Sequence, residues 1–307
     1  MKNIIVSIMM CLVAAGAVAA DDYKIIVSNP AGGGGTDMIA RRIADEYNKN
    51  TGKNLVVVNK PGGNAVIAVN EFKQEKLAVI VGHFSMHIYN YMTMANSMPY
   101  QDSNFRHLVF FGEQPGVYFV QTDSPIRNIN DFFTKQTANT DTLIGSHATN
   151  TFLNVMSLKK NKDSRFEPVN YKSPNDMIVD VIGGRLPIGF TSLGGTSLVE
   201  MEKQGRIRFI ANSTQQDLRV NDKLVPSLSR HSGVQQFNGA AIMSITPGNT
   251  EEHKKLTNEL LKIVNDPEFR AWLQKNWIIP VPHDPTKVTD FLSTIRKDHV
   301  SKSDWIR

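Results

Sequence analysis

The stretch SNPAGGGGTDMIARRIADEYNKN, from Ser28 to Asn50, contains four consecutive glycines, Gly32 to Gly35, in front of an apolar pattern typical of an amphipathic helix. A glycine run loses more backbone entropy on folding than any other sequence, so it predicts that something approaches the backbone closely here. A short β-type run, Tyr23 to Ser28, precedes the glycines. The unit is therefore predicted to be a strand, a glycine loop and a helix.

Such a unit directs free backbone N–H groups and the positive end of the helix dipole at an anion. A P-loop needs Gly-Lys-Ser/Thr, but Thr36 and Asp37 follow Gly35. A dinucleotide fingerprint would place Asp37 where its third glycine belongs. A carboxylate needs only two or three N–H donors, with a hydroxyl from Thr36 in addition, so the pattern favours a carboxylate site. A flexible turn without a ligand is the alternative, and Asp37 is expected to have a structural role in the first helical turn.

The first twenty residues have the composition of a secretory signal peptide. Lys2 gives a positive start, residues 4–13 form an apolar run too short to span a membrane, and residues 14–20 are small. Cleavage is expected near Ala19 or Ala20, with the mature protein in a bacterial periplasm, and a retained anchor is the alternative. The only cysteine, Cys11, lies in this segment, so the mature chain is expected to contain neither a disulfide nor a thiol nucleophile.

Composition narrows the possible partners. The chain has 307 residues, of which 41% are hydrophobic and 21% charged, as in an ordinary globular protein. The formal net charge is +5, but basic and acidic residues are interspersed, which is unlike a nucleic-acid-binding protein. A mildly positive protein favours small anionic ligands over cationic ones.

Strands and helices are predicted to alternate along the mature chain. Strands are expected at 23–28, 55–58 and 77–82, and the alternation returns between 116 and 211. Continuous apolar runs such as LVVV and LAVIV indicate strands buried in a parallel sheet. One more strand is predicted at 239–245, followed by helices near 251–265, 267–275 and 286–298. The chain therefore contains two α/β blocks, and each has a strand that leads through a small-residue loop into a helix.

Two motifs connect this pattern with a known family. The segment from Pro30 to Arg41, PAGGGGTDMIAR, resembles the P-x-G-G-x-x-D-x-x-A-R pattern of the TctC-like, or Bug-type, extracytoplasmic solute-binding receptors of tripartite tricarboxylate transporters, with one extra glycine. The segment from Val57 to Ala65, VVNKPGGNA, resembles the family's V-x-N-x-P-G-G/A pattern. The resemblance covers residues 23–285, and one departure is His147, where a small residue is usual. Such departures are expected to affect ligand preference.

The resemblance implies an α/β fold, a two-lobed periplasmic-binding-protein clamshell of type II. Each lobe would be a mainly parallel sheet flanked by helices, and two crossover strands would join the lobes. The implied division is a signal peptide at 1–20, a first lobe at 21–122 plus 238–307, and a second lobe at 123–237. The implied function is a monomeric periplasmic receptor that holds a small carboxylate between its lobes, closes around it, and delivers it to the membrane permease subunits of a tripartite tricarboxylate transporter.

Candidate ligand-binding residues come from both blocks. The first loop offers backbone N–H groups, the second loop offers N–H groups and hydroxyls, and the carboxyl ends of other strands add further groups. The candidates are Gly33, Gly34, Gly35, Thr36, His83, Ser85, Ser146, His147, Thr149, Asn150, Thr151, Tyr171, Thr191 and Ser192. The alternatives without a ligand are an ordinary helix cap for the second loop, and core packing or turn formation for Tyr171, Thr191 and Ser192.

No catalytic residue, cofactor or metal ion is expected. His83 and His87 have i,i+4 spacing, but no third ligand lies near them in the sequence. A secreted hydrolase is disfavoured because the chain has no Gly-x-Ser-x-Gly elbow and no His-Glu-x-x-His motif. A periplasmic sensor for a signalling partner would have the same sequence features as a transport receptor. The ligand itself could be a dicarboxylate, a tricarboxylate, an amino acid or an aromatic acid.

Overall fold

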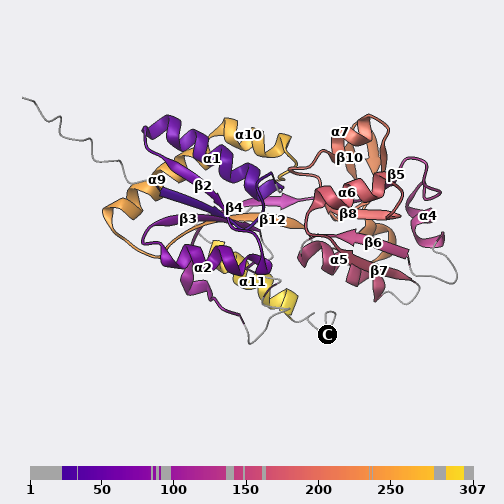
Figure 1. Cartoon of the computed structure of the whole chain (residues 1–307), viewed down its shortest axis with the longest axis horizontal. Helices are drawn as coiled ribbons and strands as arrows, with labels where there is room; N and C mark the ends of the chain where they lie inside the picture. Colours follow the sequence, from indigo (N-terminus) through magenta and orange to yellow (C-terminus); the bar gives the residue numbers. More distant parts are fainter. Residues whose placement is uncertain are drawn as a thin grey trace, which may run out of the picture.

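The computed structural model describes residues 23–32, 34–83, 86–87, 90, 98–135, 142–147, 149–160, 164–234, 236, 238–279 and 288–300. These residues form two five-stranded sheets with flanking helices, and a small ribbon of β10 (Leu218–Val220) and β11 (Lys223–Val225). Figure 1 shows the two sheets and their helices at opposite ends of the long axis of the molecule. The predicted two-lobed α/β fold is therefore confirmed. The predicted signal peptide and its cleavage sites lie outside the described residues.

The first sheet has one strand that runs against its neighbours. Its strand order is β2 (Leu55–Asn59), β1 (Tyr23–Val27), β3 (Ala78–His83), β12 (Gly239–Ile245) and β4 (Arg106–Gln114). Strand β1 pairs in parallel with both β2 and β3, whereas β12 is antiparallel to both β3 and β4. The carboxyl ends of β1 and β3 therefore meet at one edge, where open α/β sheets bind their ligands.

Helices cover both faces of this sheet. One face carries α1 (Gly35–Thr51), α9 (Glu251–Asn265) and α10 (Pro267–Lys275), and the other carries α2 (Val66–Gln74) and α11 (Val288–Val300) (Figure 1). Side chains of β1 alternate between the two cores: Ile25 and Val27 pack with α1 and α9, and Ile26 packs with α2. Burial on both faces explains why these strands are apolar without a polar alternation.

The second sheet repeats this plan. Its strand order is β7 (Phe166–Asn170), β6 (Thr142–Ser146), β8 (Ile188–Ser192), β5 (Gly116–Gln121) and β9 (Ile207–Asn212). Strand β6 is parallel to β7 and β8, and β5 is antiparallel to β8 and β9. The helices associated with this sheet are α4 (Ile129–Thr134), α5 (Thr149–Lys159), α6 (Pro174–Ile182), α7 (Leu198–Lys203) and α8 (Leu228–Ser232).

The chain crosses directly from the first sheet to the second. Strand β4 ends at Gln114 and β5 begins at Gly116, so Pro115 alone separates a strand of one sheet from a strand of the other. The return crossing precedes β12, where Gly239 pairs with Gln114. Strand β5 pairs in the second sheet, although residues 116–121 fall within the first lobe of the predicted division. The lobe boundaries at 122 and 238 stay a prediction.

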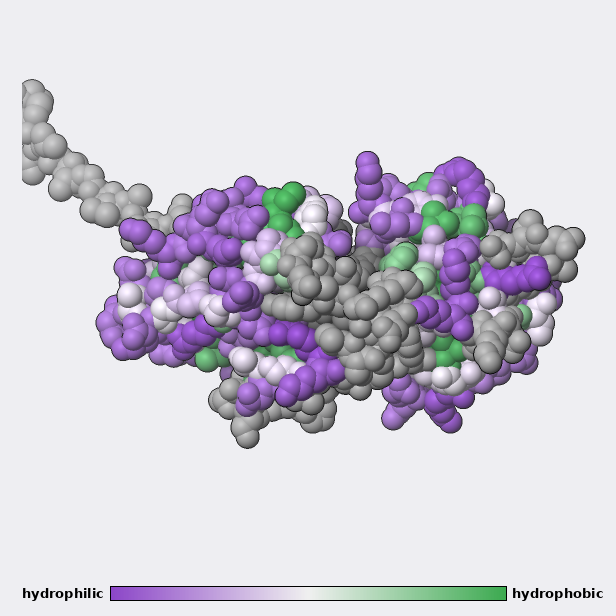
Figure 2. All heavy atoms as spheres, turned by 90° about the horizontal axis from the view of Figure 1, so that it is seen from below, coloured by the Kyte–Doolittle hydropathy of each residue, from purple (hydrophilic) through white to green (hydrophobic). Residues whose placement is uncertain are grey.

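The surface is mainly polar on the face drawn in Figure 2, where apolar residues occur in small separate groups. The exposed large apolar side chains in the described residues include Val56, Ile67, Val179 and Leu224, which come from different elements. Within the described residues, none of the helices combines the length and the apolar character that crossing a bilayer requires.

Candidate ligand-binding cleft

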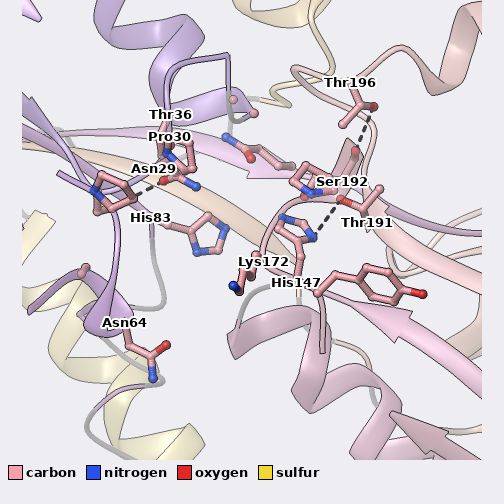
Figure 3. Close-up of a pocket in the computed structure, with 18 of the residues that line it drawn as sticks. Asn29, Pro30, Thr36, Asn64, His83, His147, Lys172, Thr191, Ser192 and Thr196 are labelled. Carbon is pink, nitrogen blue, oxygen red and sulfur yellow. Dashed lines mark hydrogen bonds between the residues drawn. The ribbon is translucent and has the colours of Figure 1, made fainter. Parts of the chain in front are cut away.

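A cavity of about 600 Å³ lies between the two sheets, and residues that end or follow strands of both sheets line it (Figure 3). The structure brings predicted residues from both lobes to its wall. These residues are Gly34, Gly35, Thr36, His83, His147, Tyr171, Thr191 and Ser192. The predicted candidates therefore gather around one cleft, and their contact with a ligand stays a prediction.

The remaining candidates are not part of the described wall. Ser146 and Thr151 are both almost fully buried, and the Thr151 hydroxyl accepts a hydrogen bond from the His147 N–H at 3.1 Å. Gly33 and Ser85 lie outside the described residues, and so do the side chains of Thr149 and Asn150. Among the described side chains of the second loop, His147 alone reaches the cleft.

The first loop presents its backbone. Gly34 caps helix α1 with φ 98° and without a side-chain cap, and the first N–H groups of a helix have no acceptor within it. Gly35 fits because it lacks a side chain, since a Cβ there would lie 2.6 Å from Nε2 of Gln114. The positive end of the α1 dipole thus lies at the cleft wall with backbone N–H donors, which is the geometry of an anion site.

Asp37, in the first turn of α1, stabilises the conformation of the glycine loop through hydrogen bonds. Its side chain is only 2% exposed, and it accepts hydrogen bonds from the Gly32 N–H at 2.8 Å, Arg41 Nε at 2.9 Å and Asn59 Nδ2 at 2.7 Å. Burial acts to raise the pKa of Asp37, but these hydrogen bonds outweigh it and hold the pKa below its usual value. These bonds give Asp37 the structural role in the loop that the sequence predicted.

Gln114, at the end of β4, was not among the sequence candidates. It is 2% exposed, lines the cleft, and its Nε2 has no hydrogen-bond partner among the described residues. A buried amide donor without a partner is costly, so this group is suited to a ligand oxygen. No strand was predicted for residues 106–114, so the amide donor at the end of β4 was not predicted either.

Two histidines, one from each lobe, approach each other in the middle of the cleft (Figure 3). His83 ends β3 and His147 follows β6, and His147 Nδ1 lies 3.4 Å from the Thr191 hydroxyl. Burial lowers the pKa of both rings to about 4, and in His83 the charge of His147 adds to the effect. Both rings are therefore neutral at pH 7, and each offers one hydrogen-bond donor and one acceptor.

The charge of the cleft wall is positive. Lys172 is the one charged side chain among the described residues that line it, and none of those residues is acidic. Figure 3 shows Lys172 beside His147, with Asn64 on the opposite side of the cleft. The Tyr171 hydroxyl donates to Asp180 at 2.8 Å, and burial together with this bond raises the pKa of Tyr171 to about 12. Tyr171 therefore contributes a neutral side chain.

The lobes touch through glycine backbone. Gly195 follows β8 with φ 72°, and a Cβ on it would lie 2.4 Å from the carbonyl carbon of Gly34 and 2.6 Å from the Gly35 nitrogen. A second link is the Leu193 N–H, which donates to the Pro115 carbonyl at 2.9 Å. The second lobe thus packs directly on the loop that presents the α1 amides.

A family profile described as "Tripartite tricarboxylate transporter family receptor", TctC, matches residues 39–304. The chain belongs to the TctC family. The resemblance noted from the glycine and V-x-N-x-P-G-G motifs is therefore confirmed. Members of this family are solute-binding receptors, so the cleft between the lobes is interpreted as the solute-binding site. One curated relative of this TctC receptor is the "UPF0065 protein in gbd 5'region" of Cupriavidus necator, which is 24% identical over 285 residues, 90% of this chain and 84% of the relative.

Solved structures share the fold of this TctC receptor. A protein of R. palustris, solved with adipate, is 20% identical with a TM-score of 0.78, and the match covers 92% of this chain and 96% of that one. MatC from Rhodopseudomonas palustris, solved with bound malate, is 16% identical with a TM-score of 0.75, and the match covers 94% and 99%. At these identities the likeness concerns the fold.

Proposed function

We propose that the protein is a periplasmic receptor, without enzymatic activity, that captures a small dicarboxylate between its lobes and passes it to the membrane subunits of a tripartite tricarboxylate transporter. The observation that carries the proposal is the cleft wall. At one end lie the amides of α1 and the unpaired Gln114 amide, elsewhere on the wall lies Lys172, and no described residue of the wall is acidic.

The two groups of donors favour a ligand with two anionic ends. The α1 amides and Gln114 together supply several donors to one carboxylate, as charge-assisted hydrogen bonds that each contribute about 1.5–3 kcal/mol. Lys172, in the other lobe, supplies a point charge for a second carboxylate. Adipate and malate, which occupy two structural relatives, are dicarboxylates, and this agrees with the proposed class.

A hydrolase is the less favoured function. It would need a histidine that is basic enough to activate a nucleophile, and the pKa values of His83 and His147 near 4 make both rings poor bases at neutral pH. The described cleft wall also lacks a carboxylate that could orient either ring. A periplasmic sensor would use the same cleft, and recovery of either transporter subunits or a signalling kinase with the ligand-loaded protein distinguishes these two functions.

The test is thermal unfolding of the mature chain, residues 21–307, after unfolding and refolding to remove any carried-over ligand. The midpoint of unfolding is measured with a panel of small dicarboxylates, and the shift with each one is compared with the shift produced by the monocarboxylate of the same carbon number. A ligand at a hundred times its Kd adds about 2.7 kcal/mol, and the midpoint should rise by about 2–4 °C per kcal/mol. No shift with any acid, together with native mass spectrometry that finds nothing on unstripped protein, would contradict the proposal.

Lys172 provides the sharper test of the dicarboxylate class. Lys172→Met should reduce the shift produced by a dicarboxylate to that of its monocarboxylate partner, because the second charge loses its counterpart. Lys203→Met is the control, since Lys203 is exposed at the end of α7 and does not line the cleft. If the shift falls equally for dicarboxylates and monocarboxylates, Lys172 contributes only to the overall positive potential of the cleft and does not bind a second carboxylate.

A further inference from the structure

A second cluster of titratable side chains lies in the first lobe, and none of its members lines the cleft. His87 follows β3, Asp102 belongs to the short helix η4 (Asp102–Asn104), and His107 lies on β4. One ligand atom from each residue, two ring nitrogens and one carboxylate oxygen, lie within 4.8 Å of one another. The cluster packs with Phe105, whose ring contacts both imidazoles.

His87 is the observation that needs explanation. Its side chain is 0% exposed, and neither ring nitrogen has a hydrogen-bond partner among the described residues. Its ring centroid lies 4.7 Å from that of His107, with the two rings nearly perpendicular. A fully buried imidazole leaves at least one donor and one acceptor unsatisfied here, and native proteins rarely keep such groups without a purpose.

His107 has the arrangement of a metal-binding histidine. Its Nδ1 lies 2.8 Å from the Ser244 hydroxyl, while its Nε2 is buried without a partner among the described residues. In metal sites the second ring nitrogen is held in this way by an outer hydrogen bond, which fixes the ring and leaves the lone pair of the other nitrogen free.

Asp102 completes the donor set and opens it to solvent. Its side chain is 32% exposed, which gives an ion a route to the buried rings. Arg296 of α11 donates to both carboxylate oxygens, with Nη2 2.8 Å from Oδ1 and Nη1 2.5 Å from Oδ2, and its Nη2 also donates to the His87 carbonyl at 2.8 Å. A carboxylate has about four acceptor positions, so Asp102 retains lone pairs beyond those that Arg296 uses. The guanidinium charge is expected to limit the affinity for a cation without removing the site.

We propose that His87, Asp102 and His107 form a binding site for a divalent transition-metal ion, and that Zn²⁺ fits it best. Two imidazole nitrogens and one carboxylate oxygen are a common Zn²⁺ donor set, with water in the fourth position. A bound ion would accept a lone pair from a ring nitrogen of both His87 and His107. It would also link the segment after β3, helix η4 and strand β4, and through Arg296 it would be connected to helix α11. No metal ion was expected from the sequence, because the i,i+4 pair His83 and His87 has no third ligand near it in the sequence, and the structure instead brings His87 together with Asp102 and His107.

The experiment uses the mature chain, purified without a histidine tag, stripped with EDTA and kept free of carboxylates that chelate metals. Isothermal titration with Zn²⁺ should give one ion per chain with a Kd in the micromolar range or tighter, and elemental analysis should confirm the stoichiometry. Co²⁺ in place of Zn²⁺ should give visible absorption bands of a site with nitrogen and oxygen ligands. His107→Gln should weaken Zn²⁺ binding at least 30-fold, whereas His231→Gln, at an exposed histidine, should leave it unchanged.

Ser244→Ala separates a metal site from simple packing, because loss of an outer partner typically weakens metal binding about 10–100-fold while leaving the ligands in place. His107 and Ser244 are tested in preference to His87, whose replacement in the core can prevent folding, and circular dichroism verifies the fold of each variant. The proposal is overturned if Zn²⁺ binds no tighter than 100 μM, or if His107→Gln binds it as well as His231→Gln does.

Discussion

The two loops that face the cleft begin from the same sequence plan and end with different roles. Each follows a strand, contains small residues and precedes a helix. In the first loop the backbone itself faces the ligand space, and the Asp37 carboxylate accepts a hydrogen bond from the Gly32 N–H and supports the loop. In the second loop Ser146 and Thr151 are buried, the Thr151 hydroxyl accepts a hydrogen bond from the His147 N–H, and the side chain of His147 reaches the cleft.

This difference suggests a division of work within one site. Backbone amides at a helix end bind any carboxylate of suitable size, because they interact only with its negative charge and its two oxygens. His147 is held in place by Thr151 and Thr191. Its side chain can therefore discriminate between ligands by the shape and the protonation state of the part that is not the bound carboxylate. The first lobe should therefore provide general affinity and the second lobe selectivity.

The largest effect is expected at the contact between the two lobes. In Gly195→Val the new side chain would meet the Gly34 backbone at 2.4 Å, and backbone atoms there cannot move aside without opening the cleft. The affinity for the carboxylate should fall at least about 100-fold, equivalent to about 2.7 kcal/mol. Isothermal titration measures the loss, and small-angle scattering should show a more open molecule.

Gly205→Val is the matched control for this substitution. Gly205 has φ 71°, nearly the same as the φ 72° of Gly195, but among the described residues no atom beyond its two chain neighbours lies within 4 Å of its Cβ position. Both substitutions carry the strain of a left-handed backbone, roughly 1–3 kcal/mol of stability, and only Gly195→Val should change affinity. Equal affinities in the two variants would mean that the lobes need not meet here for binding.

The support of the first loop is expected to give the next largest effect. Asp37→Asn removes a buried charge that accepts hydrogen bonds from three residues, and it should lower the free energy of unfolding by about 2 kcal/mol at pH 7. Because the folded pKa lies below the unfolded value, this stability is present above about pH 4 and is lost as the pH falls through the folded pKa. The difference between wild type and variant in urea denaturation should therefore shrink below pH 4.

Glu259→Gln provides the comparison for Asp37→Asn. Glu259 pairs with Lys262 on the surface of α9, and such a pair contributes under about 1 kcal/mol. A difference for Asp37→Asn as small as that for Glu259→Gln would argue that the glycine loop holds its shape without the buried carboxylate.

Gln114→Leu tests the amide that the sequence analysis missed. Its Nε2 has no partner among the described residues, so the stability of the empty protein should stay within about 0.5 kcal/mol or rise slightly. Carboxylate affinity should fall about 10-fold, because a hydrogen bond to a charged group is lost. Gln204→Leu, at an exposed glutamine on the surface, should alter neither quantity. A stability loss with unchanged affinity would assign Gln114 to the framework.

The sequence predicted the fold well because its strands are buried on both faces. The run Ala78–Gly82 is buried at every position and forms a strand inside the first sheet, whereas the equally apolar Leu55–Val58 forms the edge strand β2, in which only Leu55 is buried. The glycine loop is specified by backbone conformation at Gly34 and by close approach at Gly35. Strand β4 was missed because it joins apolar residues to His107, Glu113 and Gln114, whose places depend on partners more than a hundred residues away.

The candidate site was predictable only in part for a related reason. A loop between a strand and a helix can be located from local sequence, but which of its side chains turn toward the cleft depends on the opposite wall. Ser146 and His147 are neighbours in the sequence, yet Ser146 is buried and His147 faces His83 of the other lobe. Lys172 and Gln114 reach the cleft through the arrangement of the two sheets, which no local pattern encodes.

The smallest predicted effect concerns pH and His147. Its pKa is about 4 in the folded protein and about 6.5 when unfolded, so the unfolded chain binds more protons between these values. The stability of the empty protein should therefore fall as the pH drops from 6.5 to 4, and His147→Gln should reduce that fall by about 1 kcal/mol once partial solvent screening is considered. Urea denaturation at pH 7 and 4.5 measures the difference.

Ligand binding should reverse the sign of this pH dependence. A carboxylate beside His147 favours the imidazolium, so wild-type affinity should rise a few-fold between pH 7 and pH 5.5, whereas that of His147→Gln should change little. His83 and Lys172 also face the ligand space, so His83→Gln is measured in parallel to separate the two rings. His231→Gln serves as the exposed control. If wild type and His147→Gln have the same pH profile, the second loop does not read protonation, and its selectivity must come from shape alone.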